Sequence, residues 1–173
     1  GLNASNAILA ALIHKMKTGV AQNIYISLWD SAIAALVNQA HNALASGKDP
    51  QRMGSAHPNL VPYRAFQASD GWFVIGVGSD NQWAHLCEHL ELENQENWHT
   101  NAGRIADREN IESIVGEIVA KYDRQTLERL LEGVPCAPVN TITEALNDPQ
   151  SVARGVVTDY NGVQVLASPL RFY

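Results

Sequence analysis

The first part of the chain combines a helical pattern of apolar residues with a short extended pattern. Residues 1–17 predict a helix that Gly19 closes, and its apolar positions form one stripe: Ile8, Leu9, Leu12, Ile13 and Met16. The opposite face is largely alanine, so we expect a second surface to cover this helix. Residues 23–29 predict a strand, and residues 32–45 predict a second helix. Helix, strand and helix at this spacing are typical of an open α/β layer.

The middle of the chain predicts a polar loop that leads into a β-hairpin. Residues 54–63 contain prolines that restrict the residues before them to extended conformations. Strands are expected at residues 63–66 and 72–77, because an Asp-Gly pair between two apolar runs is a strong hairpin signal. The second strand is apolar on both faces, so helices should lie against it.

Three helices are predicted after the hairpin. The first begins after Ser79 or Asp80 and has one apolar stripe: Trp83, Leu86, Cys87 and Leu90. Residues 91–110 are polar and predict an irregular segment. Asp107 is a candidate cap for the clearest helix of the chain, and Asp123 is a candidate cap for the next.

The last part of the chain predicts short elements with strong local signals. Residues 134–139 are bounded by prolines and favour an edge strand. Thr141 and Glu144 fit a capping box at the start of a short helix. A second hairpin is expected around the Asn-Gly pair at positions 161 and 162.

Composition excludes several classes of function. The chain has 173 residues and a net charge of −6, from 12 Lys and Arg against 18 Asp and Glu, which argues against a nucleic-acid partner. Its two cysteines make neither a disulfide framework nor a metal quartet, so a cytoplasmic location is expected. The longest apolar run, residues 7–13, is too short to span a membrane.

Other polar and aromatic residues fit structural roles. His85 and His89 have i, i+4 spacing, but no third ligand or nearby glutamate completes a zinc motif, so no metal site is expected. Trp72, Trp83 and Cys87 are expected in the core. No glycine-rich phosphate loop is present, and four scattered cations are assigned to solvated surface: Lys48, Arg52, Arg64 and Arg104.

An ordered set of short motifs resembles the family III CoA-transferases. The motifs are Thr18-Gly19-x-x-Gln22, Ser27-Leu-x-Asp30, Gly54-x-Ala-His-Pro-Asn59, Pro62-Tyr63, Asp70-Gly71, Gly78-Ser-Asp80-x-Gln82-Trp83, Leu86-Cys87, Asn101-Ala-x-Arg104-Ile105, Pro135-Cys-Ala-Pro-Val-Asn140, Asp148-Pro-Gln150 and Ala153-Arg154-Gly155. Each motif is short, but together they cover essentially the whole chain in one collinear order.

The resemblance implies an enzyme that moves coenzyme A between carboxylic acids through anhydride and thioester intermediates on an aspartate. In the family this aspartate immediately precedes the helix with which the chain begins, and Gly1 and Leu2 match the residues just after it. We therefore expect no catalytic residue in this chain and no activity from it alone. The implied partners are an acyl-CoA and a carboxylic acid as substrates, with no bound cofactor and no membrane, in an intertwined homodimer.

The resemblance also gives a fold class and a domain division. The expected fold is α/β with an α+β small domain. Residues 1–46 would be a helix-strand-helix remnant of a Rossmann-like, CoA-binding large domain, and residues 47–62 a linker and active-site loop. Residues 63–173 would form the small domain of antiparallel hairpins packed with helices, together with the start of a return segment.

Five residues of the loop are candidates for the acyl site: Gly54, Ser55, Ala56, His57 and Asn59. The family places a flexible loop over the active site, from which backbone N–H groups can reach the acyl group, and small residues suit such an approach. His57 is a candidate acid, base or substrate ligand. The alternative is a structural linker in which His57 and Asn59 hold the loop by hydrogen bonds. Residues 135–140 fit either the lining of the acyl pocket or an edge strand.

Three hypotheses for function stay open at this stage. The first is a fragment of a CoA-transferase. The second is a fragment of an acyl-CoA racemase of the same superfamily, whose acid and base residues also lie upstream. The third is a non-catalytic interaction module. Asp30 is an alternative nucleophile within the chain, although we expect Asp30 or Ser31 to cap the second helix.

Overall fold

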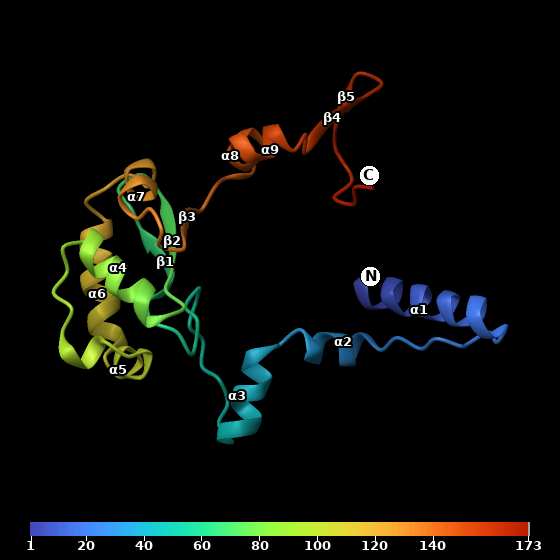
Figure 1. The fold of residues 1–173 in the computed structure, drawn as a ribbon, viewed down its shortest axis with the longest axis horizontal. Coiled ribbons are helices and arrows are strands. Elements are labelled where there is room, and N and C mark those ends of the chain that lie inside the picture. The colour runs from blue at the N-terminus through green and yellow to red at the C-terminus, as the bar shows by residue number, and fades with distance from the viewer. Residues whose placement is uncertain (173) are drawn as a thin grey trace. The chain divides into compact units, whose positions relative to one another are not determined.

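A computed structural model describes residues 1–172 of the chain, and Figure 1 labels its helices and strands. The chain divides into two compact units, residues 1–52 and the residues from Met53 onward. The elements confirm the expected fold class of helices mixed with small antiparallel sheets. The assignment of residues 1–46, 47–62 and 63–173 to parts of a larger two-domain protein stays a prediction.

The first unit contains three helices, α1 (Leu2–Thr18), α2 (Leu28–Ala34) and α3 (Asn38–Ser46). Helix α1 ends as expected at Gly19, whose left-handed φ of 75° lets its N–H donate to the Lys15 carbonyl. None of the residues in these three helices is buried. The apolar stripe of α1 is exposed, from 50% at Leu12 to 86% at Met16, so the described residues do not supply its expected cover.

The strand expected at residues 23–29 is not formed, because the residues before Leu28 have no regular structure and Leu28 begins α2. A strand needs a neighbouring strand to bond its backbone N–H and C=O groups, and the described part of this unit contains no strand that residues 23–29 could pair with. The predicted caps of α2 are also wrong. Ser27 caps the helix, since its Oγ accepts a hydrogen bond of 3.1 Å from the Asp30 N–H.

The single helix expected at residues 32–45 is divided into α2 and α3. Val37 lies between them with a φ of 47° and a ψ of −120°, a positive-φ conformation that a β-branched residue rarely adopts and that stops helical propagation. The sequence has neither glycine nor proline at this point, so its local pattern gave no warning of the break.

The second unit contains a three-stranded antiparallel sheet. Strands β1 (Tyr63–Gln67) and β2 (Trp72–Gly76) form the expected hairpin, with Tyr63 opposite Gly76 and Gln67 opposite Trp72. Strand β3 (Cys136–Pro138) pairs with the other side of β2, so the order is β1-β2-β3. The proline-bounded segment is therefore an edge strand, as its sequence predicts.

Helices α4 (Asp80–His89), α6 (Arg108–Val119) and α7 (Arg124–Leu130) supply the core with apolar side chains. Figure 1 shows α4 and α6 beside the sheet, where α6 contacts β1. Ser79 and Asp123 cap α4 and α7 as expected. The largest fully buried apolar side chains come from the sheet, from these helices and from the segments between them: Val61, Phe73, Ile75, Val77, Trp83, Leu86, Trp98, Ile111, Val115, Leu127 and Leu131.

Three expectations for this unit are wrong. Residues 91–110 contain two ordered elements, η1 (Glu96–Trp98) and α5 (Asn101–Ala106), because Trp98 inserts into the core with 1% exposure. The indole N–H of Trp98 donates to the Asp107 carboxylate at 2.8 Å, so Asp107 precedes α6 without capping it through its side chain. Trp72, which was expected in the core, is 51% exposed. Successive side chains of a strand point to opposite faces of the sheet, so Trp72 lies on the exposed face when Phe73 lies on the buried one.

The remaining elements follow their local sequence signals. Helix α8 (Ile142–Asn147) has the expected capping box, and α9 (Pro149–Ala153) begins with its proline. Strands β4 (Val157–Tyr160) and β5 (Val163–Leu166) form the second hairpin. Its turn contains Asn161 and Gly162 at φ values of 55° and 81°, the conformation for which an Asn-Gly pair is favoured.

A surface ion network gives the fold a testable acid dependence. Arg124 Nη2 lies 3.0 Å from Glu144 Oε1, and Arg124 Nε lies 3.3 Å from Asp70 Oδ2. The hydrogen bonds that Glu144 receives from Arg124 and from the Thr141 backbone lower its pKa from 4.5 to about 2. A lowered folded-state pKa means that the ionised form contributes stability above pH 4.5 and that this contribution disappears as the pH falls toward 2.

We therefore expect the urea midpoint of the chain to fall more steeply between pH 4.5 and 2 than that of the Glu144→Gln variant. Glu117→Gln is the matched control, because Glu117 is exposed and forms no ion pair with any described residue. Parallel acid dependence in the wild type and Glu144→Gln would contradict the assignment.

Candidate functional site

The candidate loop lies along the free edge of β1. Its first half contacts the backbone groups of β1 that β2 does not use: the Ala65 N–H donates to Ser55 Oγ at 3.1 Å, and the His57 N–H donates to the Tyr63 carbonyl at 2.8 Å. These contacts occupy an edge that would otherwise be open to pairing with another strand. Strand β1 therefore pairs with β2 on one side and positions the loop on the other.

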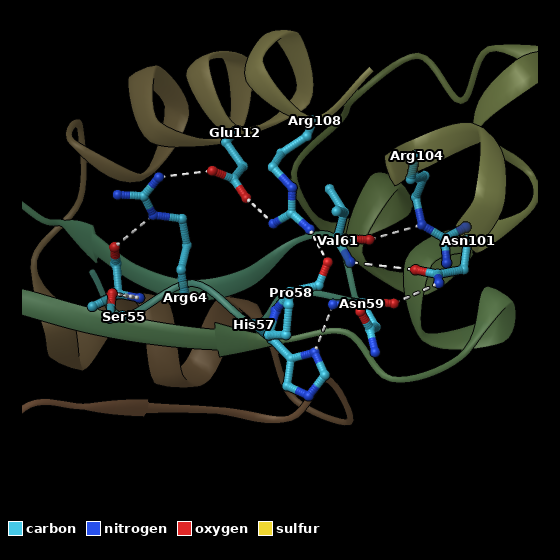
Figure 2. A network of polar contacts seen from close by, with 11 residues as sticks. Ser55, His57, Pro58, Asn59, Val61, Arg64, Asn101, Arg104, Arg108 and Glu112 are labelled. Atoms are coloured by element: carbon cyan, nitrogen blue, oxygen red, sulfur yellow. Dashed lines mark hydrogen bonds and ion pairs between the residues drawn. The ribbon is translucent and has the colours of Figure 1, made fainter. Parts of the chain in front are cut away.

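The second half of the loop is held by side chains from α5 and α6. Asn101 Nδ2 donates to the Asn59 carbonyl at 2.8 Å, and its Oδ1 accepts from the Val61 N–H at 3.3 Å. Arg108 Nη2 donates to the Pro58 carbonyl at 2.9 Å. An extended segment has no internal hydrogen bonds, so these side chains supply the partners that its backbone requires (Figure 2).

Arg104 anchors the end of the loop inside the core. Its side chain is fully buried, and its Nε and Nη1 donate to the carbonyls of Val61 and Trp98, each at 2.8 Å. Its Nη2 lies 2.9 Å from Asp80 Oδ1, and its guanidinium carbon lies 5.5 Å from the centre of the Trp83 ring. The prediction that Arg104 belongs to solvated surface is wrong, because the fork geometry of arginine satisfies three separated acceptors at once.

His57 has a structural contact within the loop. Its Nδ1 accepts a hydrogen bond of 3.1 Å from the Asn59 N–H, so the neutral ring carries its proton on Nε2. The ring centre lies 5.3 Å from that of Tyr63, at an interplanar angle of 55°. This contact supports the interpretation that His57 helps to hold the loop, while a role for His57 in the reaction stays a prediction.

The turn at the start of the loop presents two backbone donors. The Ala56 N–H donates to the Met53 carbonyl at 3.0 Å, which closes a turn around Gly54 and Ser55. Gly54 has a φ of 60°, which favours glycine, and a Cβ at this position would meet nothing within 4 Å. Gly54 and Ser55 are exposed, and their N–H groups form no hydrogen bond with any described residue.

Sequence reasoning did not single out Arg108 or Glu112. Glu112 lies on α6 between two arginines, with Oε2 2.7 Å from Arg64 Nη1 and Oε1 3.0 Å from Arg108 Nη1. The charges of the three side chains are therefore coupled. Arg64, whose side chain is 37% exposed, is at the surface as expected but is paired with Glu112. Asn101 and Arg104 lie on α5 and Arg108 and Glu112 lie on α6, so no single helical period gives a local signal for this cluster.

The cysteines and histidines do not extend the site. Burial raises the pKa of the Cys87 thiol from 9.0 to about 11, and burial also raises the pKa of Cys136, so both stay protonated and poorly nucleophilic near neutral pH. Residues 1–172 contain no group of three or more His, Cys, Asp or Glu side chains that could hold a metal ion. Residues 135–140 form the edge-strand region, and their proposed place in an acyl pocket is not tested by these contacts.

Comparison with known proteins identifies the family. The family model described as CoA-transferase family III matches residues 1–172. The chain belongs to this family. The collinear motifs of the sequence therefore predict the correct family.

Characterised CoA-transferases are similar to most of the chain. Succinate–glutarate CoA-transferase of Agrobacterium fabrum is 38% identical over 164 residues, which are 92% of this chain and 41% of that protein. Succinyl-CoA:mesaconate CoA-transferase of Haloarcula hispanica is 36% identical over 154 residues, 88% of this chain and 39% of that protein. This family III chain thus spans about two fifths of the length of these curated relatives.

A solved structure supports the fold of this family III chain. The crystal structure of a CAIB/BAIF family protein from Brucella suis has 41% sequence identity and a TM-score of 0.77, covering 99% of this chain and 47% of that chain. Among residues 1–172, no helix is long and apolar enough to cross a membrane.

Replacing Arg104 should reveal how much the loop anchor contributes. We expect Arg104→Lys to destabilise the chain by about 2 kcal/mol, because one ammonium nitrogen would replace the three nitrogens with which Arg104 binds Val61, Trp98 and Asp80. Asp80→Asn should cost less than about 1 kcal/mol, since the Asp80 side chain is 55% exposed. Urea unfolding of the 173-residue chain measures both. Equal losses would show that the ion pair, rather than the two carbonyl contacts, provides the stability.

Proposed function

We propose that this chain is part of a longer CoA-transferase (EC 2.8.3 type) that moves coenzyme A from an acyl-CoA to a carboxylic acid. The observation that carries the proposal is the family match over residues 1–172, together with curated relatives that are CoA-transferases. Succinate, glutarate and mesaconate, which appear in the names of those relatives, are all dicarboxylic acids. A short dicarboxylic acid and its CoA thioester are therefore the proposed substrates.

The proposed reaction uses an aspartate of the longer protein as nucleophile, as the family resemblance implies. Its carboxylate attacks the thioester carbonyl, the C–S bond breaks, and CoA leaves as a thiolate while a mixed anhydride forms. The thiolate then attacks the aspartyl carbonyl, which releases the first acid and leaves an aspartyl-CoA thioester. The acceptor carboxylate reverses these two steps and departs as the new acyl-CoA, and the aspartate is regenerated.

In this proposal the loop at residues 54–59 supplies hydrogen-bond donors to the reacting carbonyl. Each attack places negative charge on a carbonyl oxygen, and fixed N–H donors stabilise such an oxyanion. The N–H groups of Gly54 and Ser55 are suitable, because both residues are exposed and these N–H groups form no hydrogen bond with the described residues. The small side chains of Gly54, Ser55 and Ala56 permit close approach, while His57 and Asn59 hold the loop.

We also propose that the longer protein is a cytoplasmic homodimer of intertwined chains. The exposed apolar stripe of α1, 51% exposed at Ile8 and 58% at Leu9, supports burial of this helix against further protein. Sedimentation of the longer protein tests the oligomeric state. A monomer at every concentration would contradict this part of the proposal.

The direct test is an exchange assay with succinyl-CoA and isotope-labelled glutarate. We expect the longer protein to form labelled glutaryl-CoA and the 173-residue chain alone to form none, because the proposed nucleophile lies outside it. Exchange by the chain alone would assign the nucleophile to one of its own carboxylates. If the longer protein inverts the α-carbon of an acyl-CoA and exchanges no CoA, the alternative hypothesis of an acyl-CoA racemase is supported instead.

Changing Gly54 tests the role of the loop. In the longer protein, Gly54→Ala should lower kcat about tenfold, since alanine is strained at a φ of 60° and the turn must move its N–H donors. Gly155→Ala is the matched control, because Gly155 has a φ of 57° in open space outside the loop. Exchange kinetics with both variants measure the effect. Equal kcat values for the two variants would contradict a role for the loop N–H groups in stabilising the oxyanion.

A further inference from the structure

One carboxylate connects the candidate loop to the sheet and to helix α6. The Glu112 side chain is 9% exposed, and its two oxygens bind Arg64 on β1 and Arg108 on α6. Figure 2 shows Glu112 between these two arginines, with Arg108 extending to the Pro58 carbonyl. The contacts therefore form a series from Arg64 through Glu112 and Arg108 to the loop.

Glu112 determines where the Arg108 guanidinium lies. Arg108 uses Nη1 for Glu112 and Nη2 for Pro58, and its side chain is only 17% exposed. A long arginine side chain loses considerable rotamer entropy when it is fixed, and a charged partner one helical turn away offsets that loss. Without the carboxylate, Arg64 and Arg108 would keep like charges close together without their common counter-ion.

The loop depends on this series more at one end than at the other. Pro58 has no N–H of its own, so its carbonyl is the group through which α6 holds this residue. Gly54 and Ser55, at the opposite end, are exposed residues whose N–H groups form no hydrogen bond with the described residues. The contacts of Ser55 and His57 with β1 hold one side of the turn, and a fixed Pro58 further limits the space that the two donors can explore.

We propose that Glu112 is a positioning residue, which acts through Arg108 and the Pro58 carbonyl to hold the loop where its N–H groups meet the reacting carbonyl. This inference rests on the proposed function, and it extends that function to a side chain that touches neither substrate nor nucleophile. Glu112→Gln keeps the shape of the side chain but removes the charge that both arginines share.

The first test measures loop order without any substrate. Hydrogen exchange of the amides of His57, Asn59 and Val61 should become about tenfold faster in Glu112→Gln, while exchange across β2 stays unchanged. Glu117→Gln, an exposed change on the same helix, should leave loop exchange unchanged. Unchanged loop exchange in Glu112→Gln would overturn the proposal.

A double-mutant cycle separates positioning from a general structural role. If Glu112 acts through Arg108, the Arg108→Gln variant and the double variant should show the same increase in loop exchange as Glu112→Gln. Arg64→Gln should increase it less, because the contacts from Glu112 to Pro58 stay in place. Additive increases in the double variant would mean that the two residues act independently, which would overturn the proposed series.

Kinetics of the longer protein test the link to the reaction. Glu112→Gln should lower kcat about tenfold and leave KM for the acyl-CoA unchanged, since it moves donors that act on the transition state. Faster loop exchange with an unchanged kcat would overturn the role of Glu112 in the reaction. If the wild-type longer protein shows no transferase activity, the proposed function fails. The double-mutant cycle measured by hydrogen exchange still decides whether Glu112 positions the loop.

Discussion

The unit that begins at Met53 depends on the hydrogen bonds of one buried guanidinium. The chain enters the core at Val61, which is fully buried, and the Val61 carbonyl needs a donor there because it is shielded from bulk solvent. Arg104 supplies that donor and also binds the Trp98 carbonyl and the Asp80 carboxylate, so one side chain joins the loop, η1 and α4. A buried charge is costly unless each of its donors finds a partner, and here Nε, Nη1 and Nη2 all do.

The loop has no secondary structure, and it is ordered because its backbone carbonyls, like that of Val61, need hydrogen-bond donors. Asn101 and Arg108 continue the series of side-chain donors to the carbonyls of Asn59 and Pro58. Exposure increases along this series, from 1% for the Arg104 side chain to 17% for the Arg108 side chain, and Gly54 at the far end is exposed. The loop is therefore anchored in the core at one end, while its exposed end contacts the edge of β1 through Ser55 and His57. This arrangement suits a segment that must present donors while staying in place.

Local sequence signals predicted the elements that satisfy their own backbone groups. The capping box of Thr141 and Glu144 and the Asn161-Gly162 turn involve residues at most three positions apart, and both are present. Contacts between distant residues were missed: Arg104 meets Val61 across 43 positions, and Arg108 meets Pro58 across 50. No periodicity distinguishes a buried arginine from a solvated one. The family motifs located the loop, but they did not show which side chains hold it.

The contrast between α1 and residues 23–29 shows the limit of such prediction most directly. Both segments have the apolar pattern that their predicted structures require, yet α1 forms and the strand does not. A helix closes its hydrogen bonds within the segment, so α1 is present even though its apolar stripe is exposed. A strand takes its hydrogen bonds from a neighbour, and no neighbour lies among the described residues of this unit. The pattern at residues 23–29 thus specifies a strand only when another strand lies beside it, because the information for pairing is shared between two segments.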